Sequence, residues 1–221
     1  MMQRVPEAEL MTAQEQARAY AEADFEEANA LFVSRFRQCF GGSVQGQALD
    51  LGCGPADIVC RLALSYPALC FDAVDGAAAM LAWAERRVEA RGAADRIRLL
   101  QRHLPCRDLP DERYQVIISN SLLHHMRDPD DLWAMIAAYG DSGARVMVMD
   151  LLRPASVAAA RALEQAYAAD APPVLRQDFF NSLLAAYRPE EVADQIQRSG
   201  LKGLAVDVIS DRHWLVSGQL A

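Results

Sequence analysis

The sequence predicts a single α/β domain built on a mostly parallel, doubly wound sheet. Two observations lead to this fold class. Short apolar segments alternate with helix-favouring segments from about residue 45 to residue 155, which is typical of parallel strands joined by crossover helices. A glycine turn at Gly52 and Gly54 directly follows the first apolar segment. A chain of 221 residues has room for one such domain and its additions.

Each element of this core is assigned from local composition and periodicity. Strands are expected at 47–51, 69–74, 96–101, 114–119 and 144–150. Helices are expected between them at 56–66, 78–91 and 129–139. Because strand and helix alternate, helices should cover both faces of the sheet.

The pattern changes on both sides of the core. Residues 6–40 are expected to form two helices that lie over the glycine turn as a lid. After the core, helices are expected at 155–169, 178–186 and 189–199, followed by two strands at 204–209 and 214–217. The short turn between these strands makes them antiparallel. The single domain therefore divides into an N-terminal helical lid, a core, a helical cap and a C-terminal β-hairpin, at 1–44, 45–155, 156–200 and 201–221.

The residues around the glycine turn predict a nucleotide-binding site. The first strand ends at Asp50, the glycine turn follows, and the second strand ends at Asp75. Strand, glycine loop, helix, strand and acid form a nucleotide-binding βαβ unit. A dinucleotide-binding loop has its third glycine at the sixth position, whereas this chain has Asp57 there.

The charges around the turn favour one kind of nucleotide. Asp50 and Asp57 would lie near the position of a dinucleotide's pyrophosphate, where negative charge opposes an anion. S-adenosylmethionine has no phosphate, and carboxylates attract its sulfonium and ammonium groups. Asp75 could accept hydrogen bonds from the ribose hydroxyls. The sequence therefore favours S-adenosylmethionine as the cofactor and argues against a nicotinamide oxidoreductase.

Four segments, in this order and spacing, resemble the class I S-adenosylmethionine-dependent methyltransferases. Residues 50–54 match the acid-x-Gly-x-Gly pattern of that family, and Ala56 stands in place of its third glycine. Residues 114–129 look like the fourth-strand segment of the small-molecule branch (type 11, ubiquinone-methyltransferase-like), and 144–150 look like the fifth strand. The resemblance covers about 45–155 and implies a Rossmann-like fold and methyl transfer to a small molecule.

The ligand-binding edge of such a sheet lies at the carboxyl ends of its strands. This rule and the resemblance give the candidate cofactor-binding residues Tyr20, Asp50, Gly52, Cys53, Gly54, Asp75, Gly76, Met80, His103, Leu104, Asn120 and Ser121. Family members often place an acid after the third strand, facing the adenine amino group. This chain has Arg102 and His103 there, so we expect backbone groups or another side chain to recognise adenine.

Methyl transfer from a sulfonium is an in-line displacement that needs a general base only when the acceptor is protonated. Histidine suits that role, and the candidates are His124, His125 and His213. The candidate substrate-binding residues are Arg153, Arg176, Asp178, Phe179, Asn181, Ser182 and Arg212. Each set also has a structural interpretation, because histidines can pack within a fold and Asp178 or Asn181 can cap a helix.

The composition and the net charge limit the kinds of binding partner that we expect. A net charge of −8 and a pI near 5.0 argue against a nucleic-acid partner. Five cysteines without CxxC spacing predict neither a disulfide framework nor a structural zinc site, and no metal is expected. We find no leader-like or membrane-spanning apolar segment, so we expect a cytoplasmic monomer or homodimer with a small-molecule substrate.

Other functions stay open at this point. The chain could methylate a protein, a carrier-bound substrate or RNA, although its acidic charge argues against RNA. It could also bind the nucleoside without catalysis. An arsenic methyltransferase would need several of the five cysteines to meet in space.

Overall fold

The structure is a computed structural model that describes residues 2–7, 13–110 and 113–221. Its strands are β1 (Gly46–Leu51), β2 (Leu69–Asp75), β3 (Ile97–Gln101), β4 (Tyr114–Asn120), β5 (Gly140–Leu151), β6 (Leu204–Val208) and β7 (His213–Gln219). Its helices are α1 (Gln14–Glu22), α2 (Glu26–Phe40), α3 (Asp57–Ser65), α4 (Ala78–Ala90), α5 (Asp130–Tyr139), α6 (Val157–Ala168), α7 (Pro173–Ala185) and α8 (Pro189–Ser199), with a 3-10 turn η1 (Leu123–His125).

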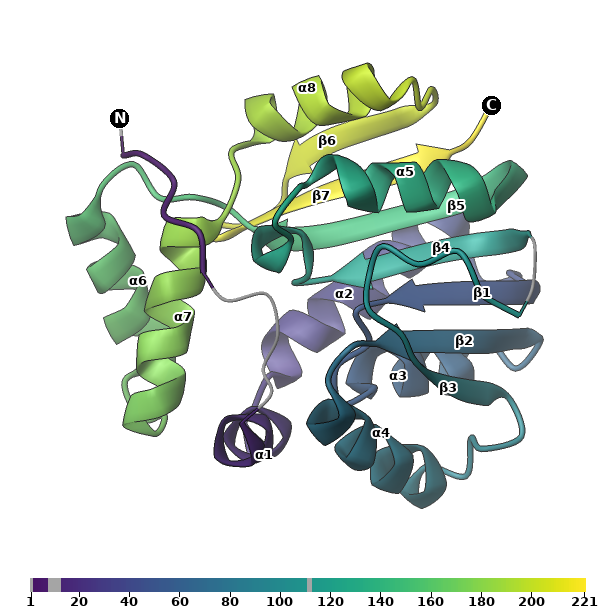
Figure 1. Cartoon of the computed structure of the whole chain (residues 1–221), viewed down its shortest axis with the longest axis horizontal. Helices are drawn as coiled ribbons and strands as arrows, with labels where there is room; N and C mark the ends of the chain where they lie inside the picture. The colour runs from purple at the N-terminus through teal and green to yellow at the C-terminus, as the bar shows by residue number, and fades with distance from the viewer. Residues whose placement is uncertain (1, 8–12, 111–112) are drawn as a thin grey trace.

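The strands form one mixed sheet with the order β3-β2-β1-β4-β5-β7-β6 (Figure 1). Strands β1 to β5 run parallel, whereas β7 is antiparallel to both β5 and β6. The predicted fold class is confirmed, including the antiparallel hairpin. The chain reverses its direction across the sheet between β1 and β4, and this switch point is where open α/β sheets bind ligands.

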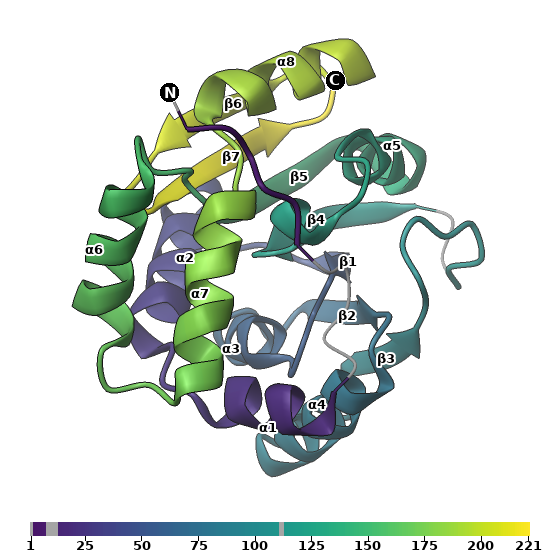
Figure 2. The same cartoon turned by 60° about the vertical axis from the view of Figure 1, so that its left-hand side comes forward.

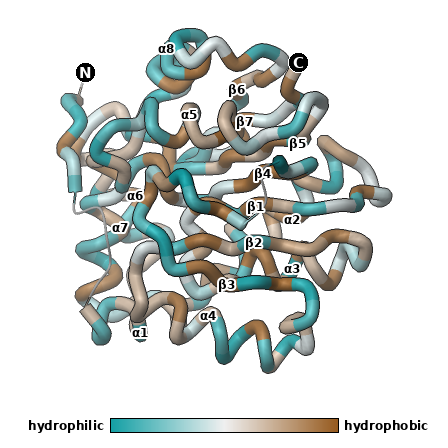
Figure 3. The backbone as a smooth tube through the Cα atoms, turned by 45° about the vertical axis from the view of Figure 1, so that its right-hand side comes forward, coloured by the Kyte–Doolittle hydropathy of each residue, from teal (hydrophilic) through white to brown (hydrophobic). Residues whose placement is uncertain are grey.

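Alternate residues of the strands build the two core layers. Val116 and Ile118 of β4 pack with α2, α3 and α4 on one face, and Ile117 packs with α5 and α8 on the other. In Figure 3 the hydrophobic colour recurs along the strands, as expected for strands covered on both faces. Helix α2 contributes the buried Phe32 and Phe36 to the first layer, so it covers the sheet instead of acting as a lid.

The cap helices α6 and α7 pack against each other at the carboxyl edge of the sheet (Figure 2). Leu151 at the end of β5 joins Phe180 and Leu183 of α7 in a small apolar cluster. Helix α7 begins at Pro173, five residues before the predicted start, because proline is well suited to the first turn of a helix. Asp178 and Asn181 therefore lie inside α7, which rules out the structural interpretation that one of them caps this helix.

The N-terminal segment Met2–Glu7 is extended and lies along α7 and η1. The Val5 amide donates to the Leu184 carbonyl over 3.0 Å, and Arg4 donates to the carbonyls of Ala185 and His124 over 2.6 and 2.9 Å. We predicted helix from residue 6, but α1 begins at Gln14. Part of that prediction, residues 8–12, lies outside the described residues. Among the described residues, no helix is both long and apolar enough to cross a membrane.

One buried carboxylate on β2 links three strands of the sheet, because its partners lie on β3 and β4. Asp72 on β2 is 2% exposed, and it accepts hydrogen bonds from Arg98 over 2.6 and 2.8 Å and from the Tyr114 hydroxyl over 2.6 Å. We predict that Tyr114→Phe lowers the free energy of unfolding by about 1.5–3 kcal/mol, because a hydrogen bond to a charged group is lost. Urea unfolding measures this value.

A matched control is Tyr66→Phe, which removes a hydrogen bond of 2.9 Å from the Tyr66 hydroxyl to the neutral carbonyl of Gly41. Its expected cost is about 0.5–1.5 kcal/mol. Equal losses in the two variants would contradict the special role of the Asp72 carboxylate.

Candidate active site

The glycine turn is shaped by close backbone contacts. The amides of Gly52 and Cys53 both donate to the Val74 carbonyl over 2.9 Å, which ties the turn to β2. Gly52 has φ +77°, and a Cβ there would lie 2.8 Å from a methyl carbon of Leu122. Glycine is therefore needed both for the backbone angle and for the space.

The same turn ends in a strained residue. Ala56, which stands in place of the third glycine of the pattern, has φ +62° and is fully buried immediately before α3. Left-handed backbone is uncommon for a residue with a Cβ, and such strain occurs often at functional sites. A side-chain clamp also holds this region, because Arg87 donates to the carbonyls of Pro55 and Ala21 over 2.9 and 2.8 Å.

Asp75 at the end of β2 connects the turn to the next helix. Its carboxylate accepts hydrogen bonds from the amides of Gly54 and Ala77, each over 2.8 Å. Burial raises the pKa of this carboxyl above its usual value, and the two amide hydrogen bonds partly offset that effect. Each carboxylate oxygen has a second lone pair, so Asp75 can still accept hydrogen bonds from a ligand.

Asp50 at the end of β1 is the most electrostatically unusual group of the site. Its side chain is 2% exposed, and burial together with the nearby charge of Asp75 raises its pKa to about 8. Among the described residues it forms no ion pair. A cationic ligand beside Asp50 and Asp75 would therefore supply a missing counter-charge.

The negative charge of Asp57 is less available to repel an anion than the sequence predicts. Its carboxylate forms an ion pair of 2.9 Å with Arg61 and accepts a hydrogen bond from Asn29 on α2. Arg61 also pairs with Glu26 over 2.6 Å. The charge of Asp57 is thus compensated, and Asp50 and Asp75 are the acids that favour a cation.

A cleft of about 390 Å³ opens over these residues, which is a size typical of small-molecule sites. Its lining includes every cofactor-binding candidate, namely Tyr20, Asp50, Gly52, Cys53, Gly54, Asp75, Gly76, Met80, His103, Leu104, Asn120 and Ser121. The N-terminal part of the lining includes the stretch 20–26, from the last residues of α1 to the first residue of α2, and this stretch provides the lid-like cover. Arg102 is absent from this lining and instead pairs with Asp108 over 2.7 Å.

The three candidate histidines have different surroundings. His125 lines the cleft, whereas His124 is 2% exposed and its Nδ1 pairs with Asp150 at the end of β5. Burial opposes the charged form of His124, but Asp150 and Glu7 outweigh it and raise its pKa. His213 lies outside the cleft lining.

His213 is placed at the ligand edge of the sheet, opposite Leu151 in the β5–β7 register. Its side chain is 5% exposed, and its Nδ1 lies 3.0 Å from the Ser210 hydroxyl. Burial and the neighbouring Arg212 lower its pKa to about 4, so it is neutral at pH 7. These contacts fit a structural role for His213.

The structure brings none of the seven substrate-binding candidates to the cleft lining. Within the hairpin and cap they contact other protein groups instead. Arg153 pairs with Glu191, Arg176 pairs with Glu164, and Arg212 pairs with Glu27 and Asp211. Asp178 accepts a hydrogen bond from Gln16, and Asn181 accepts one from Gln177. Phe179 packs in the cap, and Ser182 lies beside Glu7. Sequence order correctly placed the cap at the ligand edge, but helix packing turned these side chains toward the protein.

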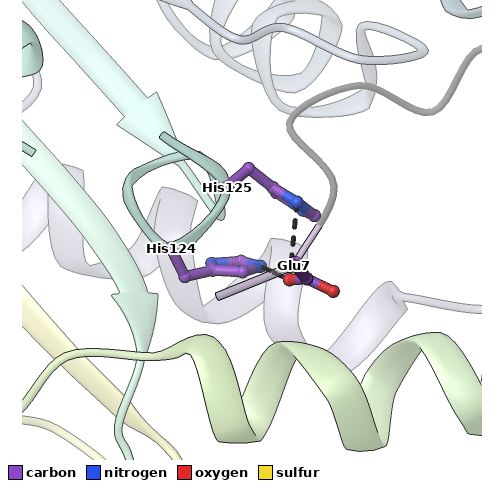
Figure 4. A group of neighbouring side chains, drawn as sticks. All are labelled: Glu7, His124 and His125. Carbon is purple, nitrogen blue, oxygen red and sulfur yellow. Dashed lines mark ion pairs between the residues drawn. The ribbon is translucent and has the colours of Figure 1, made fainter. Parts of the chain in front are cut away.

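Glu7 is the residue that sequence reasoning missed. Its Oε1 lies 3.4 Å from His124 Nε2 and 3.4 Å from His125 Nδ1 (Figure 4). Local sequence carried no signal for it, because Glu7 is far from the histidines along the chain. The group of potential metal ligands found among the described residues is Glu7, His124 and His125. The cysteine cluster that an arsenic methyltransferase would need is therefore not found among these residues.

Residues 48–143 match a family model described as a methyltransferase domain. The central part of this chain is therefore similar to a methyltransferase domain. An uncharacterised methyltransferase of Mycobacterium tuberculosis is 30% identical over 106 residues, which are 48% of this chain and 51% of that protein. The chain therefore spans about half the length of the curated relatives it matches.

Solved structures extend the likeness to almost the whole domain. A SAM-dependent methyltransferase from Aquifex aeolicus has a TM-score of 0.70 at 15% identity, covering 93% of this chain and 98% of that chain. A Haemonchus contortus phosphoethanolamine N-methyltransferase, solved with phosphomonomethylethanolamine and S-adenosylhomocysteine, has a TM-score of 0.67 at 13% identity, covering 94% and 57%. The fold expected from the resemblance to the class I S-adenosylmethionine-dependent methyltransferases is confirmed, and the match to a methyltransferase domain agrees with it.

The raised pKa of Asp50 predicts a pH-dependent stability. The pKa of Asp50 is about 8 in the folded protein and about 4 in the unfolded chain. Its contribution to the stability of the folded protein is therefore fully present below pH 4 and is lost as the pH rises through about 8. In the ligand-free protein, the free energy of unfolding of the wild type relative to Asp50→Asn should decrease steadily from pH 4 to pH 8. Urea unfolding at several pH values measures it, and parallel curves would refute the prediction.

Proposed function

We propose that this protein is an S-adenosylmethionine-dependent methyltransferase that acts on a small-molecule acceptor. The observation that carries the proposal is the pair of buried carboxylates, Asp50 and Asp75, in a cleft of suitable size beside the glycine turn. A nucleoside with a sulfonium and an ammonium group fits this negative site, whereas a pyrophosphate does not. The methyltransferase domain match supports the same conclusion.

The residues present fit the cofactor. Asp75 would accept hydrogen bonds from the ribose hydroxyls, and Asp50 would face the cationic methionine end. Asn120 lines the cleft, and its buried Oδ1 has no hydrogen-bond partner among the described residues, so it offers a further acceptor to the ammonium group. Tyr20 stays protonated, because burial and nearby acids raise its pKa to about 12, and its hydroxyl could donate to the methionine carboxylate.

Bound S-adenosylmethionine supplies an activated methyl group, so the protein's main tasks are to position the acceptor and to exclude water. Asn120, Ser121 and His125 border the cleft beyond the glycine turn, and we place the acceptor there. Of the three candidate histidines, His125 is the one that lines the cleft, so it is the one that borders the acceptor.

Two alternative functions have less support. The cover formed by residues 20–26 suits a small acceptor better than a protein or RNA chain, and the net charge of −8 disfavours RNA. A non-catalytic binding protein would need no polar side chain such as His125 beyond the cofactor position. We keep the cytoplasm, and a monomer or homodimer, as the proposed setting, in line with the five free cysteines.

The first functional prediction concerns the cofactor. Isothermal titration calorimetry should show binding of S-adenosylmethionine and S-adenosylhomocysteine and no comparable binding of NAD. Asp75→Asn should weaken binding of both sulfur nucleosides at least tenfold, because charge-assisted hydrogen bonds are lost. Asp108→Asn removes an acid outside the cleft lining and serves as the control that keeps wild-type affinity. Tight NAD binding with no response to either nucleoside would overturn the proposal.

The second concerns His125. With any acceptor that supports formation of S-adenosylhomocysteine, His125→Ala should lower kcat by roughly 10²–10⁴-fold while cofactor affinity stays nearly unchanged. His213→Ala removes a buried histidine outside the lining. This variant should lower the free energy of unfolding and leave the kcat of the folded protein nearly unchanged. The reverse pattern would show that His213, and not His125, acts on the acceptor.

A further inference from the structure

Glu7, His124 and His125 converge from two distant parts of the chain at the acceptor side of the cleft. The two imidazole nitrogens and one carboxylate oxygen all lie within 4.8 Å of one another, and Figure 4 shows their polar ends facing a common space. His125 lines the cleft, so this space adjoins the position proposed for the acceptor. The carboxylate between the two histidines has no role in the proposed binding of the cofactor.

Ordinary hydrogen bonds do not account for the arrangement. The distances from Glu7 Oε1 to the two histidine nitrogens are both 3.4 Å, whereas N–H···O hydrogen bonds are about 2.7–3.2 Å long. Glu7 Oε1 is buried and has no hydrogen-bond partner among the described residues. A buried carboxylate oxygen without a donor indicates that something else belongs beside it.

The distances suit a metal ion. Zinc lies about 2.0–2.2 Å from nitrogen and oxygen ligands, so neighbouring ligands of a tetrahedral site are about 3.4 Å apart. Two histidines and one glutamate are also the ligand set of catalytic zinc sites, which keep a position open for water or substrate. The 3.4 Å separations in this group agree with that geometry.

The surroundings hold the ligands in place. Asp150 pairs with His124 Nδ1, which leaves Nε2 directed at Glu7, and this carboxylate–histidine arrangement commonly orients metal ligands. Asp150 also accepts a hydrogen bond of 3.2 Å from the His124 amide. The Ser182 side chain also lies beside Glu7 and lowers its pKa, which burial raises. Arg4 and Val5 fix the segment that carries Glu7 against α7 and η1.

We propose that Glu7, His124 and His125 form a binding site for a divalent cation of the zinc class, and that the cation binds a hydroxyl or phenol oxygen of the methyl acceptor. The choice of acceptor atom rests on the proposed methyltransferase function, whereas the metal site does not. A hydroxyl bound to such a cation has a lowered pKa and releases its proton to solvent. The oxygen then bonds to the methyl carbon as the carbon–sulfur bond of S-adenosylmethionine breaks, leaving neutral S-adenosylhomocysteine.

The test measures metal binding in the untagged full chain after removal of metals with a chelator. Zn²⁺ is titrated in competition with a chromophoric chelator, and Co²⁺ provides a visible absorption spectrum. We expect one Zn²⁺ per chain and a Co²⁺ spectrum without thiolate charge-transfer bands. Glu7→Gln, His124→Ala and His125→Ala should each weaken Zn²⁺ binding at least tenfold, and Asp150→Asn should weaken it roughly 10–100-fold.

His103→Ala is the matched control, because it removes a histidine from elsewhere in the cleft lining and should leave the Zn²⁺ stoichiometry and affinity unchanged. If the wild type binds no Zn²⁺, or binds it as tightly as the combined Glu7→Gln/His124→Ala/His125→Ala variant, the proposal is wrong. Thiolate bands would also overturn it by assigning the metal to cysteines. Circular dichroism checks that each variant is folded, and Glu7→Gln decides the question if a histidine variant does not fold.

Binding of S-adenosylhomocysteine to the same samples separates this inference from the proposed function. Cofactor binding without specific Zn²⁺ binding would remove the metal site and leave the methyltransferase proposal standing. Specific Zn²⁺ binding without cofactor binding would overturn the methyltransferase proposal and leave the metal site standing.

Discussion

The organisation of this site depends on two carboxylates buried at the switch point of a parallel sheet. Asp50 and Asp75 stand at the ends of adjacent strands, β1 and β2, and the amides of Gly54 in the glycine turn and of Ala77 before α4 donate to Asp75. Burying two acids this close is unfavourable, as the pKa of about 8 for Asp50 indicates. The fold carries this cost at the position where a cationic nucleoside would remove it, which is how perturbed acids commonly mark functional sites.

The segment before β1 has three separate roles. Residues 20–26 cover the cleft, while α2 continues into the apolar layer through Phe32 and Phe36. The extended stretch 2–7 lies along α7 and η1 and places Glu7 beside the two histidines. A change in this segment would therefore affect the stability of the sheet, cofactor access and the histidine cluster by different routes.

Most of the fold could be predicted from the sequence. The alternation of apolar and helix-favouring segments gave each of the strands β1 to β7 within a few residues, and the turn before His213 made the hairpin antiparallel. The errors lie where proline or tertiary contacts decide the outcome. Pro173 begins α7 instead of only ending α6, and β5 begins at Gly140, four residues early, because Tyr114 extends its pairing past a register shift.

For the site, the sequence by itself determined the residues that are local to strand ends. The glycine turn, Asp50 and Asp75 follow from chain order, because the carboxyl ends of parallel strands meet at one edge of the sheet. The tertiary structure alone decided the direction of side chains on the cap and the position of Glu7. Neither depends on local pattern: helix packing turned Arg176 and Asp178 toward other protein groups, and contacts between distant segments placed Glu7 beside His124 and His125.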